Sequence, residues 1–170
     1  MSKSGFVWQD LLGLEGILSD EERMIRDQAR AFCDQELKPT IRETYRAESY
    51  DPEIIRAMGK MGMLGCTIDG WGCAGISYTG YGLLCQELER IDSALRSTMS
   101  VQSSLVMHPI HTYGSDAQKD QYLPGLMRGD LVGCFGLTEP DGGSDPGSMK
   151  TRARRDGDDY ILHGEKTWIS

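Results

Sequence analysis

Apolar residues recur at helical spacing from about residue 20 to residue 130. The first run follows Ser19–Glu22, whose Ser-x-x-Glu spacing is typical of a capping box at a helix amino terminus. Pro39 should interrupt or kink this helix, because proline lacks the backbone N–H that a helix interior needs. The apolar face of the predicted helix carries Ile25, Ala29, Phe32 and Cys33.

Two further helices are predicted on either side of a glycine-rich stretch. Asp51-Pro52 supplies an N-cap and a first-turn proline for a short helix that ends near Gly62. The glycines that follow predict a loop, since glycine weakens a helix interior by about 1 kcal/mol relative to alanine. A helix from Tyr78 to Ile91 comes after this loop.

Two more helices complete the helical part. Asp92 or Ser93 caps the first, and His108-Pro109 should end it, because the residue before a proline disfavours the helical conformation. Ser115–Gln118 repeats the capping-box spacing at the start of the second. The residues that mark the end of this second helix are Pro124 and Gly129.

The hydrophobic period changes after residue 130. Leu131–Thr138 is short, apolar and bounded by turn residues, which predicts a buried strand. Thr151–Arg155 and Tyr160–His163 flank an Asp-Gly turn and predict a hairpin. Glu165–Ser170 reads as the start of another strand. We therefore expect a helical domain over residues 1–130 and an unfinished β domain over 131–170, either truncated or completed by another chain.

Composition and charge narrow the function classes. The net charge of −8 argues against sequence-independent nucleic-acid binding, which needs a basic surface. No apolar run approaches the roughly 20 residues of a membrane helix, and the amino terminus resembles neither a signal nor a transit peptide, so a cytoplasmic location is expected. The five cysteines form no CxxC pair and there are three histidines, which favours free thiols and no metal site.

The densest chemical signal is the loop Gly136–Asp145. Adjacent glycines and small hydroxyl residues let backbone amides approach a polar or anionic ligand closely, although an ordinary surface turn has a similar composition. The loop lacks the Gly-Lys-Ser/Thr ending of a Walker A motif, and it is not a GxGxxG that opens a helix. Nicotinamide binding on a Rossmann unit is therefore disfavoured.

Gly136–Ser148 resembles the first signature of the acyl-CoA dehydrogenase family in every specified position. Lys166–Ser170 resembles the second flavin-contacting strand of that family, and Tyr122–Leu126 also fits. The resemblance extends from about Trp8 to Ser170. It implies a fold in which an all-helical amino-terminal domain is followed by the first strands of an incomplete β-barrel domain.

Within the family, Gln86–Ser93 and Arg96–Ile110 resemble the glutaryl-CoA dehydrogenase branch. The resemblance implies that Arg96 binds the distal carboxylate of the glutaryl group and that Ser97 lies beside it. A guanidinium suits this role because it presents a fixed fork of donors to a carboxylate. The competing interpretation is a solvent-facing ion pair with Glu89, which lies two helical turns before Arg96 if the helix is unbroken.

The resemblance also implies a flavin site and a substrate site. Phe135–Thr138 would line the flavin ring, Trp168 would pack on it, and Ser144 would face the CoA thioester arm. The simpler interpretation of Trp168 is a core side chain of a β barrel, and this does not exclude packing on the flavin. The implied FAD-binding residues are Phe135, Gly136, Leu137, Thr138, Gly143, Ser144, Trp168, Ile169 and Ser170. The implied substrate-binding residues are Arg96, Ser97 and Ser144.

The activity that the resemblance implies is FAD-dependent oxidation of glutaryl-CoA with decarboxylation to crotonyl-CoA. Electron-transfer flavoprotein would be the acceptor, and the full-length protein would be a homotetramer. The family's catalytic glutamate lies in a carboxy-terminal helical domain, so no residue of this chain is assigned as the base. Alternatives are a short-chain or branched acyl-CoA dehydrogenase, which the identity of Arg96 disfavours, and a non-catalytic fragment.

Overall fold

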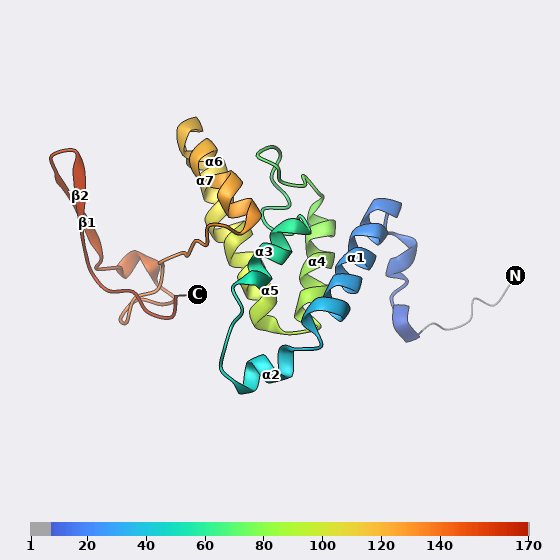
Figure 1. Ribbon diagram of the computed structural model, residues 1–170. Coiled ribbons are helices and arrows are strands. Elements are labelled where there is room, and N and C mark those ends of the chain that lie inside the picture. Colours follow the sequence, from blue (N-terminus) through green and yellow to red (C-terminus); the bar gives the residue numbers. More distant parts are fainter. Residues whose placement is uncertain (1–7, 170) are drawn as a thin grey trace, which may run out of the picture.

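The computed structural model describes residues 8–169 and consists of a helical bundle followed by a β-hairpin that projects from it (Figure 1). This arrangement confirms the predicted order of a helical domain and then an unclosed β part. The α-helices are α1 (Asp20–Phe32), α2 (Ile41–Arg46), α3 (Glu53–Lys60), α4 (Tyr78–Glu89), α5 (Ser93–Ser100), α6 (His108–Tyr113) and α7 (Asp116–Arg128). Two π-helical segments, Cys33–Leu37 and Val101–Met107, follow α1 and α5, and the strands are β1 (Arg152–Asp156) and β2 (Asp159–His163).

Side-chain caps fix the starts of the helices largely as the sequence predicts. The Oγ atoms of Ser19 and Ser115 accept from amides three residues on, and both capping boxes are complete. Asp92 caps α5 by accepting from the Ala94 amide at 2.7 Å. The carboxylate of Asp51 accepts from the Glu53 amide at 2.9 Å, so the Asp51-Pro52 start signal also operates.

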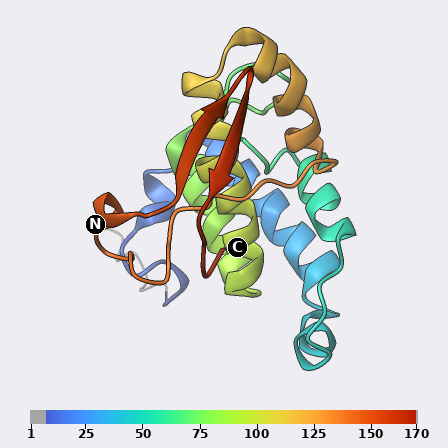
Figure 2. The same cartoon turned by 90° about the vertical axis from the view of Figure 1, so that its left-hand side faces the viewer.

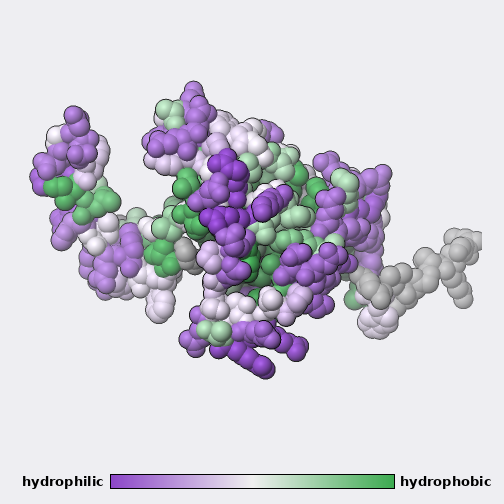
Figure 3. Space-filling view, in the orientation of Figure 1, coloured by the Kyte–Doolittle hydropathy of each residue, from purple (hydrophilic) through white to green (hydrophobic). Residues whose placement is uncertain are grey.

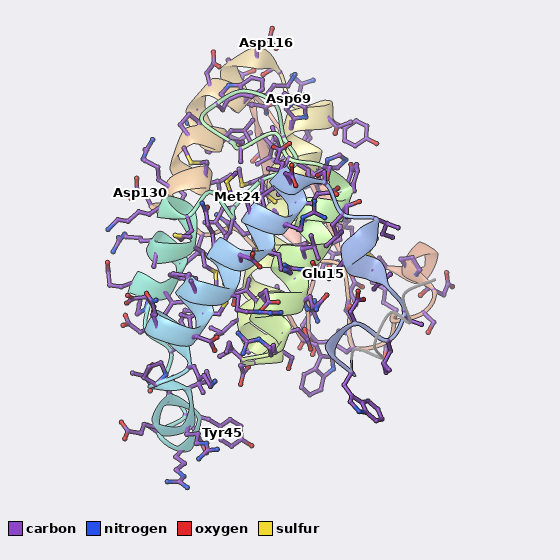
Figure 4. All side chains as sticks on the ribbon, turned by 90° about the vertical axis from the view of Figure 1, so that its right-hand side faces the viewer. Glu15, Met24, Tyr45, Asp69, Asp116 and Asp130 are labelled. Carbon is purple, nitrogen blue, oxygen red and sulfur yellow. The ribbon has the colours of Figure 1, made fainter. Side chains whose placement is uncertain are left out.

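The core of the bundle is formed by residues of α1, α3, α4, α5 and α7 and of the loop after α3. α4 packs against α1 and α5, and α3 contacts α5 and α7 (Figures 1 and 4). The amino-terminal turns lie beside α1, where Glu15 forms an ion pair with Arg26 (Figure 4). Burying a large apolar side chain removes it from water at a gain of about 1.5–3 kcal/mol. The largest fully buried apolar side chains are Met58, Met63, Leu64, Ile68, Leu88, Met99, Met107 and Leu123.

Two glycines allow α3 to approach the end of α7. A Cβ atom on Gly59 would lie 2.6 Å from the carbonyl oxygen of Arg128. Gly129 ends α7 with φ of 73°, a left-handed conformation that favours glycine, and a Cβ there would lie 2.7 Å from the Ile55 carbonyl oxygen. Any side chain at either position would push the two helices apart.

Pro39 follows the end of the first helical run at Leu37, as predicted, but two other prolines do not end helices where the sequence predicts. His108-Pro109 was expected to end a helix, but α5, the π-helical segment and α6 follow one another without an intervening loop. Pro109 lies in the first turn of α6, where a missing N–H is tolerated. Pro124 lies inside α7, and the burial of Leu123 and Leu126 beside it holds that helix in place.

The β part contains the predicted hairpin but not the two predicted flanking strands. β1 and β2 pair antiparallel, from Arg152 opposite His163 to Asp156 opposite Asp159. Leu131–Thr138 forms no strand, and neither does the described part of Glu165–Ser170, which ends at Ile169. A strand needs a hydrogen-bonded neighbour, and the hairpin is the only sheet within residues 8–169. Ser170 lies outside the described residues.

Apolar side chains remain on the surface of the β part. Figure 2 shows the hairpin lying in front of the bundle in that view, and Figure 3 shows hydrophobic surface on the hairpin and on the segment that leads to it. The exposed large apolar residues of this part are Leu131, Val132, Phe135, Leu137, Met149, Tyr160, Ile161, Leu162, Trp168 and Ile169. A face of this kind is typical of a surface that is covered in a larger assembly.

No helix among the described residues is long and apolar enough to cross a membrane. The five cysteines are free thiols, and burial raises the pKa of Cys66 to about 12. No cluster of three or more potential metal ligands occurs within residues 8–169.

Candidate functional site

The two segments with the flavin-site resemblance lie side by side. The backbone amide of Thr167 donates to the Thr138 carbonyl oxygen at 3.0 Å. The ammonium group of Lys166 donates to the Leu137 carbonyl oxygen at 3.0 Å. Residues that are about thirty positions apart in the sequence therefore form one surface, as a common ligand site requires.

Glu139 holds this surface together. Its carboxylate accepts from the amides of Lys150 at 2.6 Å and Thr151 at 3.0 Å, and from the Lys166 ammonium at 2.9 Å. The residue is only 6% exposed. Hydrogen bonds from Thr151, then from the Lys150 amide and from Lys166, lower the pKa of Glu139 to about 2. Sequence reasoning missed this role, because no local pattern links Glu139 to Lys150 or Lys166.

We expect the carboxyl group of Glu139 to titrate at about pH 2, against an ordinary value of 4.5. Because its pKa is lowered in the folded state, its contribution to stability is complete above the unfolded pKa and is lost as the pH falls toward 2. Carboxyl ¹³C NMR on glutamate-labelled protein would show one resonance with this low midpoint. It should vanish in Glu139→Gln and persist in the control Glu165→Gln; a midpoint near 4.5 would contradict the assigned hydrogen bonds.

The hydrogen bonds of Glu139 with Lys150, Thr151 and Lys166 are called the Glu139 clasp below. The side chains around this clasp form an open apolar surface. Phe135 is 42% exposed, Leu137 is 37% exposed and Trp168 is 90% exposed. Trp168 also has a φ of 57°, an uncommon conformation for a bulky residue. Within the described residues, therefore, no other side chain covers most of the indole. An exposed indole beside exposed apolar side chains fits the flat face of a large aromatic ligand.

The polar parts of the signature loop are accessible. A Cβ atom on Gly143 would meet no atom within 4 Å, and on Gly136 it would meet only the Lys166 side chain at 3.6 Å. Ser144 is exposed, and Thr138 is half-buried beside the clasp. The backbone of the loop is thus open to a ligand, but the structure does not bring Ser144 into contact with Arg96 or Ser97, which lie on α5.

Arg96 forms the ion pair that the sequence suggested, although the helix is broken. α4 ends at Glu89, and α5 begins after the cap at Asp92. The turn still brings the Arg96 Nε atom to 2.6 Å from the Glu89 carboxylate, and the Arg96 Nη1 atom donates to Ser100 at 3.2 Å. The Arg96 side chain is 36% exposed, so in this structure it faces solvent in part.

A second polar contact follows the same seam between α4 and the α5 continuation. The hydroxyl groups of Tyr81 and Ser104 lie 3.0 Å apart. Tyr81 and Glu89 are eight residues apart on α4. Arg96 and Ser104 are also eight residues apart, on α5 and the π-helical segment that continues it. Two polar contacts, Arg96–Glu89 and Tyr81–Ser104, therefore lie between the two helical segments, and we call them the polar seam.

A cluster of charges around one buried carboxylate was not predicted. Glu87 is fully buried on α4, and its carboxylate accepts from Arg30 at 2.7 and 3.1 Å and from Arg90 at 3.0 Å. Arg90 also donates to Asp34 at 3.0 Å. Burial raises the pKa of Glu87, but the hydrogen bonds from Arg30 and Arg90 outweigh it, and the net pKa is lowered. The cluster fixes α4 to α1.

Comparison with known proteins assigns both parts of the chain. Residues 19–130 match the family model for the acyl-CoA dehydrogenase N-terminal domain, and residues 134–170 match the model for the acyl-CoA dehydrogenase middle domain. Among curated proteins, the mouse mitochondrial short-chain specific acyl-CoA dehydrogenase is 34% identical over 154 residues, which are 90% of this chain and 37% of that protein.

Solved structures of acyl-CoA dehydrogenases are also similar to this chain. A glutaryl-CoA dehydrogenase from Mycobacterium smegmatis has a TM-score of 0.92 and 51% identity, covering 95% of this chain and 42% of that one. A glutaryl-CoA dehydrogenase structure from the same species in complex with FADH2 has a TM-score of 0.91 and 48% identity, covering 94% and 41%. The chain spans less than half the length of these relatives, and within that span it belongs to the acyl-CoA dehydrogenase family.

Proposed function

We propose that this chain contributes to an FAD-dependent dehydrogenase that oxidises glutaryl-CoA, with decarboxylation to crotonyl-CoA. The observation that carries the substrate assignment is Arg96, held by Glu89 and Ser100 at the start of a polar seam. Residues 1–130 would form the helical domain and residues 131–170 the beginning of the β domain. The similarity to glutaryl-CoA dehydrogenase from Mycobacterium smegmatis supports this choice of substrate.

Arg96 is suited to bind a substrate carboxylate. Its contacts with Glu89 and Ser100 engage two of the five N–H donors of a guanidinium group. A second carboxylate can therefore bind on the same fork, and Glu89 and Ser100 keep the side chain in one orientation for it. Ser97, which is half-buried one residue along α5, adds a hydroxyl group close by.

The flavin site is proposed on the surface around the clasp. The exposed faces of Phe135, Leu137 and Trp168 fit a planar ring, and the open backbone at Gly136 and Gly143 fits its polar edge and its phosphates. When bound, FAD accepts the β-hydride of the acyl thioester. This chain would bind and orient the ring and exclude water from it. The proposal includes the predicted FAD contacts of Thr138, Ser144 and Ile169. Ser170 is included on the basis of the sequence alone.

The remaining assignments stay predictions. Electron-transfer flavoprotein as the acceptor and a homotetramer in the full-length protein are proposed from the family resemblance. A cytoplasmic location is also proposed, although the mouse relative carries a mitochondrial name. No residue of this chain is proposed as the base that removes the α-proton.

The test is reduction of the flavin in the full-length, FAD-loaded enzyme. Glutaryl-CoA should bleach the flavin absorbance faster than butyryl-CoA at equal concentration, and crotonyl-CoA and CO₂ should appear as products. Reduction by butyryl-CoA alone would instead favour the short-chain dehydrogenase, which the 34% identity to the mouse protein keeps as the second candidate. If glutaconyl-CoA forms and no CO₂ is released, glutaryl-CoA is the substrate but the proposed decarboxylation is wrong.

A further inference from the structure

The side chain of Gln102 joins three parts of the molecule. It lies in the π-helical segment Val101–Met107 and is 1% exposed. Its Nε2 atom donates to the carbonyl oxygens of Leu126 at 3.0 Å and Leu131 at 2.8 Å, and its Oε1 atom accepts from the Gly133 amide at 3.0 Å. Two carbonyl acceptors and one N–H donor allow only one orientation of the amide, so all of these contacts belong to one arrangement.

These contacts hold the start of the proposed flavin segment. Leu131 and Gly133 lie immediately before Phe135–Thr138. Val106, in the same π-helical segment as Gln102, packs so closely that a Cβ atom on Gly133 would lie 2.4 Å from its side chain. Gln102 and Val106 thus fix where the chain leaves the helical bundle.

Packing on the other side of this segment is incomplete. A largely apolar pocket of about 420 Å³ lies between Val132, Gly133 and Gln102 and the side chains of Tyr50, Ile55 and Thr98. The segment therefore has space to move into if its hydrogen bonds to Gln102 are lost. In this structure those hydrogen bonds, together with the one from the Leu131 amide to the Gly125 carbonyl oxygen at 3.1 Å, set its position, because close packing is present on one side only.

The same helix carries the proposed carboxylate site. α5 passes into the π-helical segment at Val101 with helical backbone angles, and Val101 still donates to Ser97 and Thr98. Arg96 and Gln102 are six residues apart on this continuous helix. π-helical segments are frequent at functional sites, because the extra residue redirects the side chains around it.

We propose that Gln102 is a positioning residue that sets the separation between the acyl-binding helix and the flavin segment. This rests on the proposed function of both parts. Hydride transfer requires the reacting atoms at about 3–3.5 Å, and a misplacement of about 1 Å can lower the rate by about a hundredfold. Gln102 would touch neither substrate nor flavin, and would act through its hydrogen bonds to Leu126, Leu131 and Gly133.

The test uses Gln102→Met and Gln102→Asn in the full-length, FAD-loaded enzyme. Methionine fills a similar volume without an amide, and asparagine keeps the amide but is one methylene too short. Each variant should slow flavin reduction about tenfold or more, equally for glutaryl-CoA and butyryl-CoA, with nearly unchanged FAD content and substrate dissociation constant. The matched control is Gln35→Met, because Gln35 is exposed in the other π-helical segment.

A second measurement does not depend on activity. Hydrogen–deuterium exchange of peptides covering residues 131–135 should be faster in both Gln102 variants and unchanged in Gln35→Met. Normal reduction rates in a folded variant with faster exchange would overturn the positioning role, as would a loss confined to FAD content. If Gln102→Met does not fold, Gln102→Asn decides. If butyryl-CoA is the better substrate, the proposed function fails. The role of Gln102 is still tested, because its variants should slow flavin reduction equally with both substrates.

Discussion

Replacing Arg96 by methionine is expected to lower the preference of the full-length enzyme for glutaryl-CoA over butyryl-CoA by at least about a hundredfold. Glutaryl-CoA brings a terminal carboxylate, and a carboxylate buried without a cation is strongly destabilised. Removing one partner of a buried charge pair typically costs about 3–5 kcal/mol. Butyryl-CoA has no such charge, so its oxidation should be little affected. The measurement is the ratio of kcat/KM for the two substrates.

The matched control is Arg56→Met. Arg56 pairs with Glu53 on α3 and is 46% exposed, comparable with Arg96, but it lies away from the polar seam. It should leave the ratio unchanged. A ratio in Arg96→Met that stays within a few fold of the parent would make the Arg96–Glu89 pair an ordinary surface ion pair. Such pairs contribute about 0–1 kcal/mol, and the acyl-CoA would then be unspecified.

The helical part could be predicted from the sequence because its signals are local. The capping boxes at Ser19 and Ser115 are confirmed, and each depends on residues only three positions apart. Proline is a reliable stop signal here only at Pro39, since Pro109 and Pro124 both lie within helical structure. Whether a helix continues past a proline depends on the burial of the residues around the proline and on π-helical turns. Neither can be predicted from the local sequence.

The candidate site was predictable only where the family motif supplied it. The meeting of Leu137–Thr138 with Lys166–Thr167 fits the resemblance. Glu139, Glu87 and Gln102 were missed as structural groups, because each bonds to residues far away in the sequence. The expected strand at Leu131–Thr138 was wrong for the same reason: apolar character suggested a strand, but pairing requires a neighbour.

Removing both arginines that face Glu87 should destabilise the folded full-length protein, and the loss should grow as the pH rises. In Arg30→Met with Arg90→Met, burial remains as the main influence on the Glu87 carboxyl group, so its pKa should rise above its usual value. We expect a loss of about 3 kcal/mol at pH 7, toward the lower end of what breaking a buried ion pair costs, because both arginines are partly exposed.

The sign of the pH dependence separates this explanation from simple loss of packing. In the parent, the pKa of Glu87 is lowered, so its stabilisation is present above its unfolded pKa and is lost on acidification. In the double variant the raised pKa reverses this: the protein should be least impaired below about pH 4, near the unfolded pKa of a glutamate, and most impaired at pH 7. Urea unfolding of the parent and the double variant at both pH values gives the difference in the free energy of unfolding at each pH.

Two further variants complete the design. Adding Glu87→Gln to the double variant removes the buried charge and should abolish the excess loss at pH 7. Arg23→Met with Arg56→Met removes three ion pairs with exposed carboxylates, those with Asp20, Glu53 and Asp130, and should cost about 1 kcal/mol or less for each pair. If the double variant at Arg30 and Arg90 is equally impaired at both pH values, then its loss comes from the buried aliphatic parts of the arginines. Glu87 would in that case be a polar core group whose charge contributes little to holding α4 against α1.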